Sequence, residues 1–159
     1  MKNQCLKFLF CSCLSFGAQA YNTTTNVSVL IVPDTESSTI RIEAMQDQFI
    51  TLYRKEKNKF DDIKIDFRVV SPLSVTKGYK LTLLEKMNHC DGMDINVETK
   101  FDNTVIEKGD EVSGLNFDSS DANEQWKFHK IDLEFPEILQ TDKQQICDGL
   151  IGIQVSLDI

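Results

Sequence analysis

The sequence predicts an all-β protein with the architecture of an antiparallel β-sandwich, and three observations lead to this prediction. Apolar and polar residues alternate in at least seven short segments, as in strands with one buried face and one solvated face. The segments recur at the spacing typical of sandwiches, and Gly, Pro, Asn and Asp separate them. No segment after residue 20 approaches the length of a membrane-spanning helix.

Residues 1–20 are predicted to be a secretory signal peptide and are excluded from the fold. Lys2 and Lys7 give a basic start, the stretch LKFLFCSCLSF is largely apolar, and GAQA supplies a cleavage site. These residues contain two lysines and no acidic residue, so the remaining chain has 15 basic and 25 acidic residues and a formal charge of −10. That balance argues against nucleic-acid binding, which requires a basic surface.

The first predicted strand follows the cleavage site directly, within YNTTTNVSVLIV. Pro33 ends this strand, and five residues share one parity: Thr23, Thr25, Val27, Val29 and Ile31. A weaker alternation covers residues 40–44. The next stretch, AMQDQFITLYRKEKNKF at 44–60, has no clean period and fits a loop, an irregular strand or a short helix.

The middle of the chain supplies the central strands of the predicted sandwich. Alternation covers residues 63–69 before Ser71-Pro72, and then residues 79–83 after Lys77-Gly78. A single strand is expected from Met93 to Phe101, followed by a turn into residues 105–106. The polar stretch DSSDANEQWKFH is expected to be a loop that leads into a strand near Trp126, and alternation returns at 131–135.

The last predicted strand reaches the final residue of the sequence. Its apolar residues are Ile151, Ile153, Val155, Leu157 and Ile159. A sandwich that ends on such a strand can leave one core position uncovered, and an open sheet edge is a template for association. An extended segment of another chain could fill that position by strand addition, and the first strand has the pattern to be such a segment.

Cys90 and Cys147 are the two cysteines outside the signal peptide, and in an exported protein they are expected to form a disulfide. A metal site is the weaker alternative, because these cysteines with His89 and His129 lack ligand spacing. The sequence has no G-x-S-x-G, no H-E-x-x-H and no Gly-rich phosphate loop. We therefore expect no enzyme activity and no cofactor.

Four stretches resemble one known family: NVSVLIVPD at 26–34, KFDDIKIDFRVVS at 59–71, GYKLTLLE at 78–85 and CDGLIGIQVSLDI at 147–159. Together they resemble chaperone–usher fimbrial subunits of the colonisation-factor type, found on Gram-negative enteric bacteria. The resemblance implies an incomplete immunoglobulin-like domain at 34–159 that lacks its last strand. It also implies a donor-strand extension at 21–33.

The resemblance further implies how such a subunit is assembled. A periplasmic chaperone would pair a strand with Ile151 to Ile159, and an outer-membrane usher would exchange that strand for Thr23 to Ile31 of a neighbouring subunit. The product would be a fimbria on the cell surface that mediates adhesion, with a host-cell receptor as a further partner. The alternative is a self-contained secreted sandwich that binds a ligand through its loops, in which the first strand pairs within its own chain.

Overall fold

The computed structural model describes residues 24–32, 39–139 and 145–158. The predicted signal peptide at 1–20, Thr23 and Ile159 lie outside these ranges. The strands are β1 (Thr24–Val32), β2 (Arg41–Ala44), β3 (Gln48–Arg54), β4 (Lys59–Phe60), β5 (Ile63–Pro72), β6 (Tyr79–Cys90), β7 (Met93–Asp94), β8 (Glu98–Phe101), β9 (Thr104–Val105), β10 (Glu111–Leu115), β11 (Ser119–Ser120), β12 (Glu124–Glu134) and β13 (Cys147–Leu157). The part of the chain that the structure describes holds no helix that could span a bilayer.

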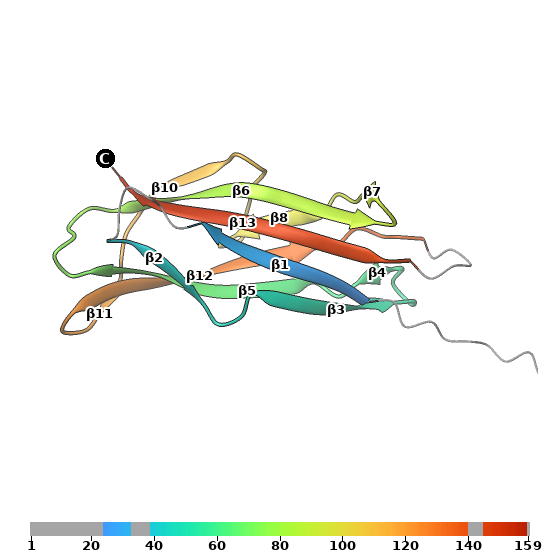
Figure 1. Ribbon diagram of the computed structural model, residues 1–159, viewed down its shortest axis with the longest axis horizontal. Coiled ribbons are helices and arrows are strands. Elements are labelled where there is room, and N and C mark those ends of the chain that lie inside the picture. The colour runs from blue at the N-terminus through green and yellow to red at the C-terminus, as the bar shows by residue number, and fades with distance from the viewer. Residues whose placement is uncertain (1–23, 33–38, 140–144, 159) are drawn as a thin grey trace, which may run out of the picture.

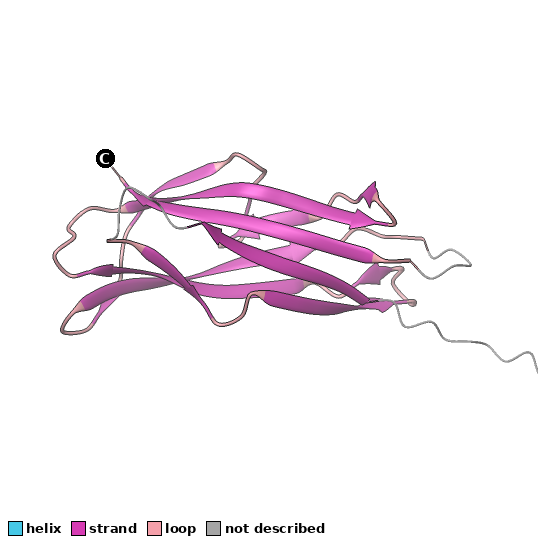
Figure 2. Ribbon diagram, viewed as in Figure 1, coloured by secondary structure: helices cyan, strands magenta, loops and turns pink. Residues whose placement is uncertain are grey.

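The strands form two sheets that face each other, as Figures 1 and 2 show. Sheet A has the order β10-β6-β13-β1-β3-β4, with β7 also paired to β6. Sheet B has the order β2-β5-β12-β8-β9, with β11 also paired to β12. The predicted all-β sandwich is therefore confirmed.

The core lies between the sheets and consists of the inward-facing residues of the long strands. In β5 the inward positions are Ile63, Ile65, Phe67 and Val69, and in β12 they include His129, Ile131 and Leu133. Sheet A contributes Tyr79, Leu81 and Leu83 from β6, together with Ile151, Ile153 and Val155 from β13. The alternation in the sequence thus reports which side chains face the other sheet.

The segment that had no clean period, residues 44–60, contains two strands joined by a tight turn. β3 and β4 pair antiparallel, and Asn58 in the turn has a positive φ of 50°. The inward residues of β3 include Thr51, whereas Ile50 and Leu52 face outward and are exposed. A polar inward residue between apolar outward residues explains why the hydrophobic pattern of this strand was ambiguous.

The prediction of a single strand from Met93 to Phe101 is wrong. β7 belongs to sheet A and β8 to sheet B, so the chain crosses between the sheets at residues 95–97. Ile95 donates its N–H to the carbonyl of Asn88, and Val97 is fully buried during the crossing. The apolar parity continues through the crossing because these residues still enter the core, although they belong to no strand.

The predicted loop before Trp126 is a short hairpin between β11 and β12. The backbone N–H groups of Asn123 and Glu124 donate to the Asp121 carboxylate, at 2.8 and 2.9 Å. These hydrogen bonds lower the pKa of Asp121. The turn therefore fixes where β12 begins.

Candidate functional site: the β1 strand and its slot

β1 lies in the middle of sheet A, between β13 and β3, as Figure 1 shows. It runs parallel to β13, with Val27 opposite Gly149 and Val29 opposite Ile151. It runs antiparallel to β3, with Val27 opposite Phe49. We call the space between β13 and β3 the slot.

The side chains of β1 alternate as the sequence predicted. Thr25, Val27 and Val29 are buried in the core, and Val27 is only 1% exposed. Asn26 and Leu30 face outward and are exposed. Ile31 takes its place in the ladder opposite Ile153.

β13 forms one border of the slot and has neighbours on both sides, β6 and β1. Ile151, Ile153 and Val155 are buried, and Leu157 is half-buried. The sequence suggested that this strand would leave an uncovered edge. In the structure of the single chain the edge is covered, because β1 of the same chain occupies the slot.

β3 forms the other border, and the sequence did not identify it. Thr51 faces the core from β3, and its hydroxyl donates to the carbonyl of Asp61 at 2.7 Å. Asp61 in turn donates its N–H to the carbonyl of Leu52. These bonds hold β3 against the β4–β5 connection independently of β1.

The disulfide between Cys90 and Cys147 joins the end of β6 to the start of β13. The two residues are paired in the ladder, and their Cα atoms are 4.1 Å apart. The predicted pairing is therefore present. β13 is joined to β6 by this disulfide and by backbone pairing along its whole length, so this border of the slot does not depend on β1 either.

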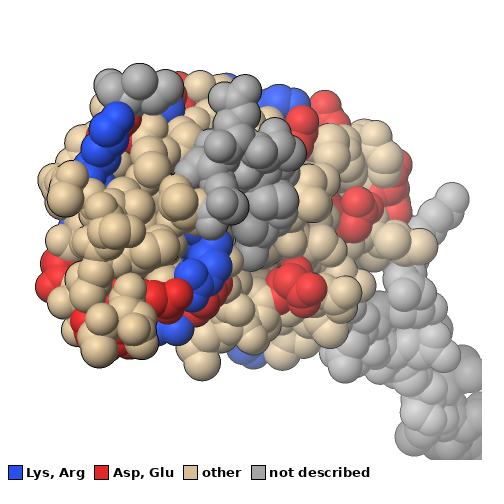
Figure 3. Space-filling view, turned by 60° about the vertical axis from the view of Figure 1, so that its left-hand side comes forward, with Lys and Arg blue, Asp and Glu red and all other residues tan. Residues whose placement is uncertain are grey.

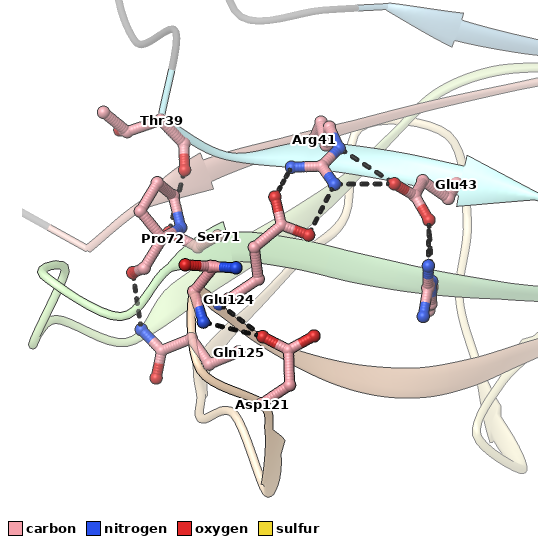
Figure 4. Close-up of polar contacts among 10 residues, drawn as sticks. Thr39, Arg41, Glu43, Ser71, Pro72, Asp121, Glu124 and Gln125 are labelled. Carbon is pink, nitrogen blue, oxygen red and sulfur yellow. Dashed lines mark hydrogen bonds and ion pairs between the residues drawn. The ribbon is translucent and has the colours of Figure 1, made fainter.

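A polar cluster fixes β2, the first strand after β1 in the sequence (Figure 4). Arg41 forms two hydrogen bonds with the carboxylate of Glu124 on β12, at 2.9 and 3.0 Å. Glu43 accepts hydrogen bonds from Arg68 on β5 and from Arg41. The bond from Arg68, followed by that from Arg41, lowers the pKa of the Glu43 carboxyl.

The same cluster reaches the first described residue after β1. The Ser71 hydroxyl donates to the carbonyl of Thr39 at 2.8 Å, as Figure 4 shows. The chain from Thr39 onward is therefore attached to sheet B by its own contacts. Residues 33–38 are the only covalent link between that part of the chain and β1.

A second buried polar group connects the two sheets away from the slot. His129 on β12 places Nδ1 2.7 Å from a carboxylate oxygen of Asp102, and its Nε2 lies in hydrogen-bond contact with the Tyr79 hydroxyl on β6. Because the carboxylate only accepts, Nδ1 donates to Asp102; in the neutral imidazole Nε2 then accepts from the Tyr79 hydroxyl. Burial, with the nearby Asp118 and Asp102, raises the pKa of Tyr79. This arrangement satisfies polar groups in the core and offers no exposed nucleophile.

The surface charges are mixed on the face that Figure 3 shows. Lys and Arg side chains lie among Asp and Glu side chains, without a continuous basic patch on that face. Elsewhere in the described chain, charged side chains form ion pairs, for example Arg54 with Asp61 and Lys80 with Glu111. Within the described ranges, no group of three or more His, Cys, Asp and Glu residues could hold a metal ion.

The chain was compared with family models, curated proteins and solved structures. No family model matches the sequence, and no curated protein matches it. Among solved structures, the chain is similar to the CooA pilin subunit from enterotoxigenic Escherichia coli, with 15% sequence identity and a TM-score of 0.42. The match covers 86% of this chain and 99% of that one.

Proposed function

We propose that the protein is a structural subunit of a bacterial surface fimbria, assembled by the chaperone–usher pathway through exchange of β1 between subunits. One observation carries this proposal. β1 fills a slot whose two borders are fixed by other contacts, and a single six-residue segment, 33–38, links β1 to the rest of the domain. A strand held in this way can be replaced by an equivalent strand from a second copy.

The free energy gained by burying β1 side chains explains why the slot should not stay empty. Burying Val27 and Val29 contributes about 1.5–3 kcal/mol each, or roughly 3–6 kcal/mol together, before the backbone hydrogen bonds are counted. These values are upper estimates, because a free strand already hides part of its surface. An empty slot would also expose the backbone of both β13 and β3, which favours aggregation.

The exchange itself has a small free-energy cost, because one β1 replaces another in the same slot and buries the same apolar face. When subunit one accepts β1 of subunit two, subunit two has an open slot for β1 of subunit three. This contact is heterologous and does not close, so it produces a filament. A periplasmic chaperone would fill the slot beside Ile151 to Ile159 before assembly, and an outer-membrane usher would catalyse the replacement.

The proposal is tested by deleting residues 21–32 from the mature chain and supplying a synthetic peptide of residues 23–32. We expect the deletion variant to aggregate alone and to become a soluble monomer when the peptide is present. A control peptide carrying Val27→Asp and Val29→Asp should not restore solubility, because it would bury two carboxylates. A deletion variant that is stable and monomeric without peptide would contradict the proposal.

The second candidate function is a self-contained secreted sandwich that binds a ligand through its loops. The pairing of β1 with its own β13 and β3 favours this candidate. The two functions differ in whether β1 leaves the slot. A fluorescent peptide of residues 23–32 should enter the intact mature protein slowly if strands exchange, and it should never enter if the sandwich is permanently closed.

A further inference from the structure

The outer face of sheet A carries exposed apolar side chains on four neighbouring strands, β3, β1, β13 and β6, which Figure 1 shows side by side. Ile50 and Leu52 on β3 are 71% and 48% exposed, and Leu30 on β1 is 45% exposed. Leu150 on β13 is half-buried, and its ladder partner on β6, Met87, is 41% exposed. We call these five residues the outer patch.

The polar residues within the outer patch are uncharged. Residues 26–30 of β1 and 48–52 of β3 include no acidic and no basic side chain. Asp148 on β13, opposite Asn26, is a charged residue at the margin of the patch. The long strands of sheet B instead direct charged side chains outward: Lys64, Asp66, Arg68, Lys130, Asp132 and Glu134.

The size of the outer patch indicates a contact surface. Single apolar residues on a protein surface are normal, whereas a contiguous patch of a few hundred Å² marks an interaction site. At about 4.8 Å between strands and about 3.4 Å per residue, the outer patch covers roughly 400 Å². This area is large enough to need a partner.

The charge of the chain restricts what can cover the outer patch. Without residues 1–20 the chain has 15 basic and 25 acidic residues, a formal charge of −10. Two copies repel each other wherever their charged surfaces meet, and the outer patch is a place where they approach without opposing like charges. The same net charge disfavours an anionic lipid surface as the partner.

The centre of the outer patch is suited to a contact between identical copies. The amide of Asn26 offers donors and an acceptor, and the hydroxyl of Ser28 offers both as well. Such groups can pair with their own copies across a two-fold axis, whereas like charges repel. An axis that crosses β1 at a right angle between Asn26 and Ser28 brings Leu30 of one copy towards Leu52 of the other, because Leu52 lies opposite Thr24.

We propose that the outer patch binds the outer patch of a second copy, so that two sandwiches pack back to back through sheet A. The contact covers roughly 800 Å² in the two copies together, below the 1,200–2,000 Å² of a stable complex. It is therefore weak, with an expected dissociation constant above about 100 µM. At the micromolar concentrations of an unfolding experiment the protein is monomeric. The contact leaves β1 in its slot and does not depend on strand exchange.

The test follows the backbone amide NMR signals and the sedimentation of the mature protein from micromolar to millimolar concentration. The amides of residues 26–30 and 48–52 should shift as the concentration rises, and the average mass should rise towards that of a dimer. Added salt should strengthen the association, because it screens the repulsion between two acidic chains.

Ile50→Lys and Phe128→Lys are a matched pair of variants. Phe128 lies on β12 of sheet B and is 66% exposed, so both substitutions replace an exposed apolar residue and reduce the negative charge equally. Ile50→Lys should weaken the association at least about tenfold, because it places an unpaired charge in the contact. Phe128→Lys should leave the association unchanged. Leu52→Lys should act as Ile50→Lys does, so the test does not depend on the folding of one variant.

Four results would overturn the proposal. The first is a protein that stays monomeric at millimolar concentration, and the second is a set of shifts that lies outside the outer patch. The third is equal weakening by Ile50→Lys and Phe128→Lys. The fourth is association that salt weakens, which indicates a contact between opposite charges, or that produces new, slowly exchanging signals from buried β1 residues, which indicates exchange of β1 between copies.

Discussion

Truncation of Val27 to alanine tests whether β1 occupies its own slot in solution. Val27 is 1% exposed and lies opposite Gly149 on β13 and Phe49 on β3. The substitution removes two buried methyl groups, at about 0.8 kcal/mol each. Because Gly149 has no side chain that could move into the space, a cavity remains and raises the expected loss to about 2–3 kcal/mol.

The loss is measured by urea unfolding, followed by circular dichroism and by the fluorescence of Trp126. With a slope of about 2 kcal/mol per molar urea, the midpoint should fall by roughly 1 M. Asn26→Ala is the matched control, because Asn26 is the preceding residue of the same strand and is exposed. It should change the free energy of unfolding by less than about 0.5 kcal/mol.

Two results would refute this reasoning. A Val27→Ala variant as stable as the parent would mean that β1 is not packed in the free protein. A loss that depends on protein concentration would mean that β1 is supplied by a second copy rather than by its own chain, because association makes stability concentration-dependent.

Three further predictions follow from the same contacts. Val29→Asp should impair donation of β1 to a neighbour and leave the chaperone complex formed, whereas Val155→Asp should prevent capture by the chaperone. Co-purification with the chaperone measures both effects, and equal loss of the complex in the two variants would contradict the roles assigned to β1 and β13. Replacing both Cys90 and Cys147 by serine should lower the free energy of unfolding by about 4 kcal/mol, since the disulfide spans 57 residues, and an unchanged urea midpoint would contradict this. Because folding lowers the pKa of Glu43, its ionised carboxylate stabilises the fold at pH values above 4.5, the ordinary pKa of a glutamate. This contribution is lost as the pH falls through the lower pKa of the folded state. Glu43→Gln should therefore be less stable than the parent at neutral pH and converge with it in acid, and a constant difference across the pH range would argue against the ion pairs.

The sequence was sufficient to predict which face is buried in β1, β5, β13 and the first half of β6, because the alternation of apolar and polar residues is a local pattern. It predicted the inward parity of Thr25, Val27 and Val29 for this reason. Strand partners depend on long-range pairing, which alternation does not encode. The sequence therefore did not indicate that β1 lies between β13 and β3.

Two other features were hidden for physical reasons. The bulge that turns Asn88 inward requires one extra residue in β6, and nothing in a period-two pattern shows where that residue falls. The crossing at residues 95–97 keeps the same parity as a strand, because Val97 enters the core from a segment outside both sheets.

The direction of β1 gives the proposed exchange a preferred product. β1 pairs with β13 over eight residues in parallel and with β3 over five residues in the antiparallel sense. Antiparallel pairing is slightly more stable per residue. A strand that entered the slot in the reverse direction would be antiparallel along the longer ladder, and a period-two pattern presents the same apolar face in either direction.

We therefore expect an exchanged strand to run opposite to the strand that it replaces. In the single chain, Val32 lies opposite Gln154. With Gln154→Cys in the variant that lacks residues 21–32, a peptide of residues 23–32 carrying Thr24→Cys should form the mixed disulfide faster than one carrying Val32→Cys. Faster trapping of the Val32→Cys peptide would show that the parallel arrangement persists. The free energy of exchange would then come from release of the 33–38 segment and not from more stable backbone pairing with β13.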